Sequence, residues 1–280
     1  MLQSPLHGIA PHSTLNAVVT QHSEVAPGLI VLQVAPDNWQ LPPFTPGQFA
    51  VLALPGAAKR CADAESEDEP ADPDKLIKRA YSIASGSHVA THLEFYISLV
   101  RSGSLTPRLM ALKIGDPIWL GPKITGAFTF DGVPDECHVA MFATGTGLAP
   151  YVSMMRTTLA RAVGRRFVVI HGARHSWELG YAGEMYTLER LCPRFTYVPI
   201  VSRPQEEPVP WCGLVGHCQD VWKQRMLADL WHQEPTPTNT HLFLCGNPRM
   251  VVDMVRLLSE AGFREHTRKT PGQIHTEKYW

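Results

Sequence analysis

The sequence predicts two consecutive domains: a six-stranded antiparallel β-barrel, followed by an α/β domain with a parallel sheet. The chain has 280 residues, of which 44% are hydrophobic and 18% charged, enough to bury two cores. Short β-like segments fill its first half, and after Pro134 strand-like and helix-like periods alternate. We therefore expect residues 1–134 to form the barrel and residues 135–280 the α/β domain.

The barrel is predicted from short apolar or alternating segments separated by turn signals such as Pro46-Gly47 and Gly121-Pro122. A short helix is expected from Thr106 to Leu112. Six segments of this kind favour a small antiparallel barrel. They are Leu15 to His22, Leu29 to Ala35, Gln48 to Ala53, Arg79 to Ala84, Leu93 to Val100 and Pro117 to Leu120.

An acidic insert is expected at about residues 56–76, before the fourth barrel segment. Residues 61–74 carry seven acidic residues and no basic one, while the whole chain has a net charge of −1. This composition predicts a solvated, disordered loop. The rest of the chain is then mildly basic, which favours anionic cofactors and acidic protein partners. A scattered surplus of Lys and Arg without a patch is an equally good interpretation.

The α/β domain is predicted from the order of its segments. Apolar strands are expected at 137–143, Phe167 to His171, Phe195 to Val201 and 241–245, and helices at 148–163, Glu178 to Cys192, Gln219 to Leu230 and 249–261. Strands that alternate with helices in this way form a parallel sheet with crossover helices.

Two glycine turns follow strands of this domain. Gly145-Thr146-Gly147 lies between a strand and a helix, and Gly246-Asn247-Pro248 repeats the arrangement. Glycine permits a close backbone approach, and the first amides of a helix attract negative charge, so each turn can hold a phosphate. Both turns are expected at the carboxyl edge of the sheet, where open α/β folds bind ligands. A tight turn without a ligand remains the alternative.

The stretch Arg79-Ala80-Tyr81-Ser82 places a cation, an aromatic ring and a hydroxyl close together. On a strand, Arg79 and Tyr81 would share one face, where the guanidinium can hold a pyrophosphate and the ring can lie on a flat cofactor. The Ser82 hydroxyl would then point to the other side or into a bend, where it can hydrogen-bond a ring nitrogen. Taken alone, these residues also fit an ordinary strand with an exposed Arg and a buried Tyr.

Several classes of site and location are not expected. No segment approaches eighteen consecutive apolar residues, and the first residues lack the pattern of a secretory signal. The six cysteines contain no CxxC, so we expect no metal site, and scattered thiols fit the cytoplasm. We likewise expect no nucleic acid partner and a monomeric protein.

The set RAYS, FYISLV, SGSLTPRL, GDPIWLGP, ATGTGLAP, HGAR, VSR, LCGNPRMV and EKYW resembles the bacterial ferredoxin or flavodoxin NADP reductases, in the plant-type ferredoxin reductase superfamily. The resemblance runs from about Asn16 to Trp280. It implies an FAD-binding barrel, an NADP(H)-binding α/β domain, and ferredoxin or flavodoxin as an acidic partner.

The resemblance also implies roles for individual residues. Ser82, Cys245 and Glu277 would lie at the reacting atoms. Tyr279 would cover the flavin ring and Trp280 would lie near the adenine of FAD. The remaining residues expected to bind FAD are Arg79, Ala80, Tyr81, Tyr96, Ile97, Ser98, Gly103, Ser104, Leu105, Thr106 and Thr144.

The NADP(H) site would combine the glycine turns with arginines that follow strands, where an NAD enzyme is expected to carry a carboxylate. The expected residues are Gly145, Thr146, Gly147, Ala173, Arg174, Ser202, Arg203, His217, Gly246, Asn247 and Asp253. His217 stands where the family usually has an arginine, which weakens the expected selectivity for NADPH at higher pH.

The expected function is electron transfer between NADPH and a one-electron carrier through FAD. Two alternatives stay open. The chain could be the reductase component of an oxygenase, differing only in its acceptor, or an FAD-binding subunit that does not turn over nicotinamide. Arg174, Arg203 and the CGNP turn argue against the last alternative.

Overall fold

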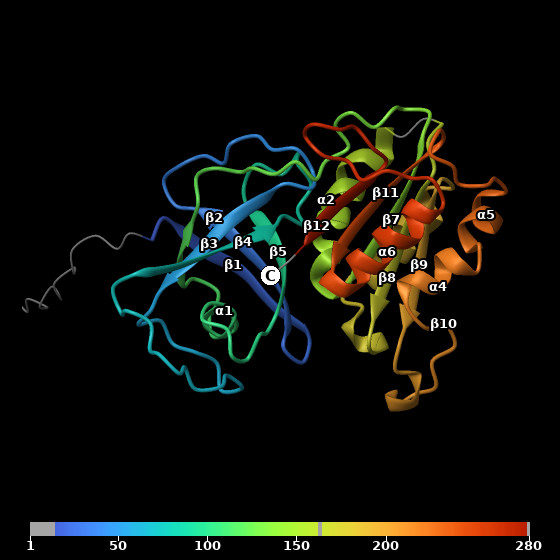
Figure 1. The fold of residues 1–280 in the computed structure, drawn as a ribbon. Coiled ribbons are helices and arrows are strands. Elements are labelled where there is room, and N and C mark those ends of the chain that lie inside the picture. Colours follow the sequence, from blue (N-terminus) through green and yellow to red (C-terminus); the bar gives the residue numbers. More distant parts are fainter. Residues whose placement is uncertain (1–14, 162–163, 279–280) are drawn as a thin grey trace, which may run out of the picture.

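The computed structural model describes residues 15–161 and 164–278. It contains two sheets, each with its own core, that lie beside one another and meet along one side (Figure 1). The first sheet is antiparallel and the second parallel, as predicted.

The first sheet has the strand order β4-β3-β6-β1-β2-β5. A bridge between Ile83, just after β4, and Phe95 of β5 joins its two outer strands and closes the barrel. Apolar side chains fill the inside, including Leu32, Leu52 and Phe95, none of which is exposed to solvent. The strands are β1 (Ala17–Ala26), β2 (Leu29–Pro36), β3 (Phe49–Pro55), β4 (Leu76–Ser82), β5 (Leu93–Ser98) and β6 (Pro117–Leu120), and helix α1 (Thr106–Met110) follows β5.

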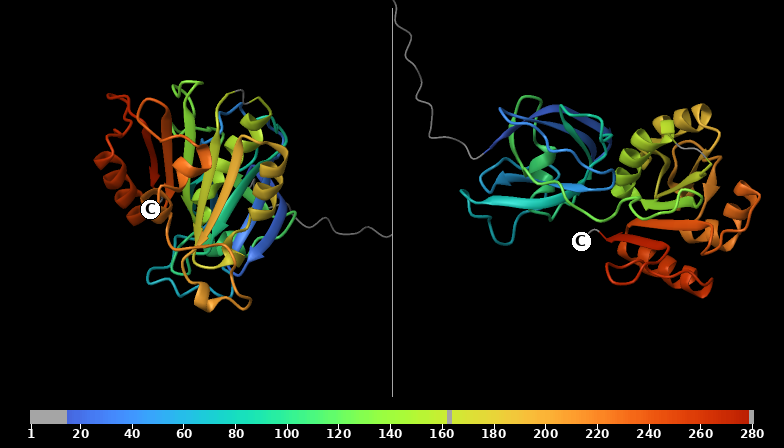
Figure 2. Two further views of the ribbon diagram at one scale, coloured as in Figure 1. Left: turned by 90° about the vertical axis from the view of Figure 1, so that its right-hand side faces the viewer. Right: turned by 90° about the horizontal axis from the view of Figure 1, so that it is seen from above.

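The second sheet has the order β10-β9-β8-β7-β11-β12, with helices on both faces (Figure 2). Its strands are β7 (His138–Thr144), β8 (Phe167–Ala173), β9 (Phe195–Val201), β10 (Leu214–Val215), β11 (Thr240–Gly246) and β12 (Ile274–Lys278). The helices are α2 (Ala149–Thr158), α3 (Ala182–Leu191), α4 (Cys218–Lys223), α5 (Met226–Trp231) and α6 (Pro248–Glu260).

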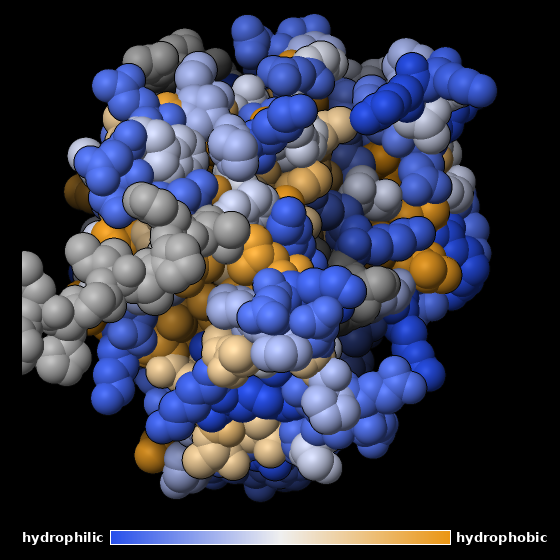
Figure 3. All heavy atoms as spheres, turned by 90° about the vertical axis from the view of Figure 1, so that its left-hand side faces the viewer, coloured by the Kyte–Doolittle hydropathy of each residue, from blue (hydrophilic) through white to orange (hydrophobic). Residues whose placement is uncertain are grey.

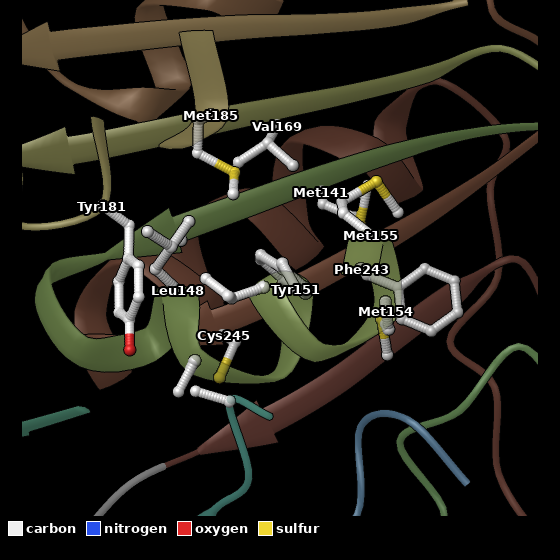
Figure 4. Close-up of a cluster of buried hydrophobic side chains, with 14 of the residues drawn as sticks. Met141, Leu148, Tyr151, Met154, Met155, Val169, Tyr181, Met185, Phe243 and Cys245 are labelled. Atoms are coloured by element: carbon white, nitrogen blue, oxygen red, sulfur yellow. The ribbon is translucent and has the colours of Figure 1, made fainter. Parts of the chain in front are cut away.

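Each face of this sheet has its own core. Helices α2 and α3 cover the face that carries Met141, Val169 and Phe243, and the sulfur-rich packing between α2 and the strands is shown in Figure 4. Helices α4, α5 and α6 cover the opposite face, around Phe142, Ile170 and Leu244. The alternation of side chains along buried strands therefore supplies two cores from one sheet.

Three features of the α/β domain differ from the prediction. The single helix expected from Gln219 to Leu230 is two helices, because Arg225 adopts a left-handed conformation (φ 58°) between α4 and α5. The short strand β10 was not predicted. No strand was predicted at 274–278, but this segment is the edge strand β12, which pairs in parallel with β11 and sets Glu277 opposite Cys245.

The acidic insert is a loop without helix or strand up to Leu76, but the prediction that it is disordered is wrong. Glu67 forms a two-pronged ion pair with the buried Arg108, with N···O distances of 2.7 and 3.1 Å. Arg60 contacts the same carboxylate at 3.0 Å. The charge pattern predicted solvation because sequence alone does not show that two basic residues lie beside Glu67.

The two domains are joined by a cluster of charged side chains. Glu94 on β5 of the barrel is 6% exposed and accepts a 2.6 Å hydrogen bond from Arg156 on α2. Arg156 also pairs with Glu184 of α3, and the Tyr181 hydroxyl donates to Glu94. Burial opposes ionisation of Glu94. The charge of Arg156 and the hydrogen bonds that Glu94 accepts from Gln33 and Tyr181 nevertheless hold the pKa of Glu94 below the usual value.

No helix in the described ranges 15–161 and 164–278 is long and apolar enough to cross a membrane. Within the same ranges, no group of three or more His, Cys, Asp or Glu side chains could hold a metal ion. Hydrophilic side chains cover most of the face shown in Figure 3, with hydrophobic ones among them.

We expect Arg156→Met to lower the free energy of unfolding by about 3 kcal/mol, because it leaves the buried Glu94 carboxylate without its cation. Urea denaturation followed by circular dichroism measures this. Arg256→Met is the matched control, since it removes an exposed pair with Glu260 and should cost less than about 1 kcal/mol. Equal losses in the two variants would contradict the role given to the cluster.

Stability should also fall in acid because of His171, whose burial lowers its pKa from 6.5 to about 4. The unfolded chain binds this proton more readily than the native state does. The contribution of His171 to the free energy of unfolding is therefore fully present above pH 6.5, and up to about 3 kcal/mol is lost as the pH falls to 4. Urea denaturation at pH 7 and pH 4.5 measures the slope. The variant His171→Gln should show a shallower slope, and an unchanged slope would refute the assignment.

Candidate functional site

Two adjoining hollows lie where the domains meet. The large cleft, of about 1060 Å³, is lined mostly by the carboxyl edge of the parallel sheet and reaches the barrel at Gly28 and Arg101. The small pocket, of about 390 Å³, is lined mostly by β4, β5 and the loop from Val100 to Thr106. Ser98 and Thr146 line both. A ligand in one hollow would therefore adjoin a ligand in the other.

The two glycine turns are packed directly against each other in the large cleft. A Cβ atom on Gly147 would lie 2.5 Å from the Cys245 carbonyl oxygen, and one on Gly246 would lie 2.3 Å from the Thr144 hydroxyl. The Asn247 amide donates to that hydroxyl at 2.7 Å. Only glycine permits this approach, so the packing explains both residues independently of any ligand.

The three residues expected at the reacting atoms come together from distant parts of the chain. The Ser82 hydroxyl at the end of β4 donates to Glu277 of β12 at 2.8 Å. The Cys245 thiol lies 3.8 Å from the same carboxylate oxygen. Ser82 and Cys245 are buried, and Ser82 lines the small pocket. A serine of the barrel and two residues of the α/β domain thus form one hydrogen-bonded group.

Most residues expected to bind FAD line the small pocket. The exposed Arg79 guanidinium, on β4, donates to the Lys78 carbonyl. The Tyr81 ring packs edge-on against Phe95, which fixes one edge of the ring. The lining residues that match the expectation are Arg79, Ala80, Tyr81, Ser82, Tyr96, Ile97, Ser98, Gly103, Ser104, Leu105 and Thr106. Thr144 lines the large cleft instead.

Tyr96 has a second role that its strand position did not reveal. Its hydroxyl donates to the Glu178 carbonyl and accepts from the Gly180 amide, each at 3.0 Å. Its ring packs edge-on against Tyr181. The side chain therefore joins the barrel to the α/β domain, while the strand beside it lines the small pocket.

The residues expected to bind NADP(H) line the large cleft, with one exception. The lining includes Gly145, Thr146, Gly147, Ala173, Arg174, Ser202, His217, Gly246, Asn247 and Asp253. Arg203 is not among the lining residues. Its amide donates to the Arg174 carbonyl at 2.9 Å, so it lies next to the cleft wall.

Carboxylates accompany both arginines. Arg174 donates through its amide, Nε and Nη2 to Glu178, the last bond measuring 2.6 Å. Burial opposes ionisation of Glu178, but Arg174 holds its pKa below the usual value. Arg203 lies 3.6 Å from Glu206, which also accepts a 2.7 Å bond from His175. An anionic ligand at this edge would therefore compete with side chains of the protein.

Sequence reasoning missed the importance of Glu178 and His171. Glu178 could have been found, because it stands only four residues after Arg174 and carries the opposite charge. In the buried His171 ring, Nε2 lies 3.2 Å from the Gly145 carbonyl oxygen and Nδ1 lies 3.0 Å from the Tyr197 hydroxyl. The ring therefore contacts the first glycine turn from inside the core. No sequence signal distinguishes it from an ordinary core histidine.

Tyr279 and Trp280, expected to lie over FAD, fall outside the described residues.

Comparison with known proteins supplies the family. Residues 141–256 match the oxidoreductase NAD-binding domain. The flavodoxin/ferredoxin–NADP reductase of Buchnera aphidicola subsp. Baizongia pistaciae is 31% identical over 87% of this chain and 90% of that protein. The one of Escherichia coli strain K12 is 32% identical over 85% and 88%. A ferredoxin NADP+ reductase from Neisseria gonorrhoeae, solved with bound FAD and NADP, has a TM-score of 0.77 at 25% identity, covering 94% of this chain and 97% of that one. The chain therefore belongs to the flavodoxin/ferredoxin–NADP reductase family.

Proposed function

We propose that this protein is an FAD-dependent oxidoreductase that transfers electrons between NADPH and a ferredoxin or flavodoxin. One observation carries the proposal: Ser82, Cys245 and Glu277 form one hydrogen-bonded group, and its serine lines the small pocket, which adjoins the large cleft. Family membership supports the same activity. The division into an FAD-binding domain, residues 1–134, and an NADP(H)-binding domain, residues 135–280, belongs to this proposal.

The small pocket suits the flavin end of FAD. It combines an aromatic ring at Tyr81, a cation at Arg79 and a loop with exposed backbone at Gly103. Planar stacking and charge-assisted hydrogen bonds are what a flat ring joined to a pyrophosphate requires. FAD, when bound, accepts two electrons from NADPH and delivers them singly to the carrier.

The large cleft suits NADP(H). The interlocked glycine turns offer backbone close to a phosphate, and Arg174 offers a cation at the edge where an adenosine 2′-phosphate would lie. Ser202 and His217 add hydrogen-bonding groups to this edge. The pairing of Arg174 with Glu178 reduces the free positive charge, so selectivity for NADPH would be moderate.

At the junction, the protein binds and orients rather than reacting covalently. The Ser82 hydroxyl and the Glu277 carboxylate hold each other in place, so a flavin ring beside Ser82 would meet hydrogen-bonding groups in a fixed position. The Cys245 thiol, which is not exposed to solvent, adds a second contact to the same carboxylate. These residues would hold the flavin and nicotinamide rings close together, which is what hydride transfer between them requires.

The acceptor is proposed to be an acidic electron carrier. Lys278 on β12 is exposed and directly follows Glu277, which accepts the hydrogen bond from Ser82. A negatively charged partner would be drawn to this side of the molecule. We further propose that the protein works as a monomer in the cytoplasm.

The direct test mixes the purified protein anaerobically with NADPH, and separately with NADH, and follows the flavin absorbance. We expect bleaching at a lower concentration of NADPH than of NADH. Glu277→Gln should slow flavin reduction by about tenfold to a hundredfold while FAD stays bound, because the orienting carboxylate is lost. Glu265→Gln, on the exposed segment beside β12, is the control. A colourless or unreactive wild-type protein would overturn the enzyme proposal.

The carboxylate beside Arg203 should reduce the affinity for NADPH. Because Glu206 is about half exposed, the effect is screened, and we expect Glu206→Gln to lower the Kd for NADPH by about twofold to fivefold. The Kd for NADH should not change, because NADH lacks the 2′-phosphate. Isothermal titration with both nucleotides measures this, with Glu260→Gln as control, and a parallel change for NADPH and NADH would contradict it.

A further inference from the structure

The acidic insert is held against the loop from Arg101 to Pro107, the loop that lines the small pocket. Two of its contacts are backbone hydrogen bonds: the Glu65 amide donates to the Arg101 carbonyl at 3.0 Å, and the Cys61 amide donates to the Pro107 carbonyl at 2.9 Å. The insert thus contacts both ends of the loop.

Two arginines extend these contacts through the middle of the loop. Arg60 donates to the carbonyls of Arg101 and Gly103, at 3.2 and 3.4 Å. Arg108 donates to the Ser104 carbonyl at 2.5 Å and to the Gly56 carbonyl at 2.6 Å. The loop carbonyls therefore bind cationic groups on the side of the insert.

Glu67 holds both arginines in place. Its carboxylate pairs with Arg108 and Arg60, at 2.7 and 3.0 Å, and its side chain is only 14% exposed. The hydrogen bonds from Arg108 lower the pKa of Glu67 to about 2, so the carboxylate is ionised at any physiological pH. With the Arg108 side chain 3% exposed, this is a largely buried ion pair, and removing one partner leaves an uncompensated charge.

The opposite side of the loop is left available to a ligand. The amides of Ser104, Leu105 and Thr106 donate to no protein group in the part of the chain that the structure describes. These residues line the small pocket, and Asp63 of the insert lines the adjoining large cleft together with Arg101. The loop carbonyls are bound by arginines on the side of the insert, and the loop amides remain available on the side of the pocket. Such amides suit an anionic ligand in the pocket.

We propose that the insert positions the loop from Arg101 to Pro107 for the phosphates of FAD, with Glu67 as the positioning residue. This rests on the proposed FAD site. The seven acidic residues of the insert thereby differ in function: Glu67 is structural to the pocket, whereas exposed neighbours such as Asp68 only add charge. The insert therefore supports the loop that lines the cofactor site and is not only a solvated loop.

The test compares FAD binding by Glu67→Gln, the matched control Asp68→Asn and the wild type, using flavin fluorescence after removal and return of FAD. We expect Glu67→Gln to raise the Kd for FAD by about tenfold or more and to speed FAD release, and Asp68→Asn to stay within about twofold. Arg60→Lys, which keeps the charge but loses the fork to the two carbonyls, should shift the Kd in the same direction by a smaller factor.

Affinity for 2′,5′-ADP, which probes the α/β domain, reports whether each variant is folded and should not change. If Glu67→Gln binds 2′,5′-ADP normally and FAD as tightly as Asp68→Asn does, the inference about the insert is wrong. If Glu67→Gln does not fold, Arg60→Lys decides: unchanged FAD affinity and release would refute the inference. A wild-type protein that binds no FAD would instead refute the proposed function.

Discussion

The site depends on the way the barrel is held against the α/β domain. Ser82 belongs to one domain and Glu277 to the other, so the hydrogen bond between them forms only in one relative orientation of the domains. The pairing of Glu94 with Arg156 fixes that orientation at one point, and the Tyr96 hydroxyl fixes it at another. Because the charged pair is largely buried, a small displacement would cost both desolvation and hydrogen bonds. The junction is therefore rigid where the two bound rings must meet.

Electrostatic pairing inside the protein shapes both hollows. At the edge of the large cleft, Glu178 and Glu206 offset the arginines that would attract a phosphate. Beside the small pocket, Glu67 offsets two arginines whose remaining hydrogen bonds go to carbonyls of the loop and of the insert. The first arrangement moderates affinity for an anion, whereas the second fixes a backbone shape. The same kind of ion pair thus has different consequences, depending on whether the arginine lies at the edge of the cleft or on the side of the loop that faces the insert.

Much of this could be predicted from the sequence, because local patterns decide it. Alternating and apolar periods gave both sheets, and the glycine turns marked the cleft edge. Contacts between distant segments could not be predicted. The edge strand β12 has only five residues and depends on its pairing with β11, and the bend at Arg225 depends on how α4 and α5 pack on the sheet. The anchoring of Glu67 likewise depends on Arg108, forty-one residues away.

The separation between Ser82 and Glu277 has a consequence for biosynthesis. The two partners are 195 residues apart in the chain, with the whole α/β domain between them except its last strand. Since a ribosome adds about 5 to 20 residues per second, roughly 10 to 40 s pass between the emergence of the serine and that of the carboxylate. The barrel can fold in that interval, but no partly synthesised chain can carry the complete reaction centre. A nascent chain that had already taken up a flavin would thus be unable to orient a nicotinamide until translation was almost finished.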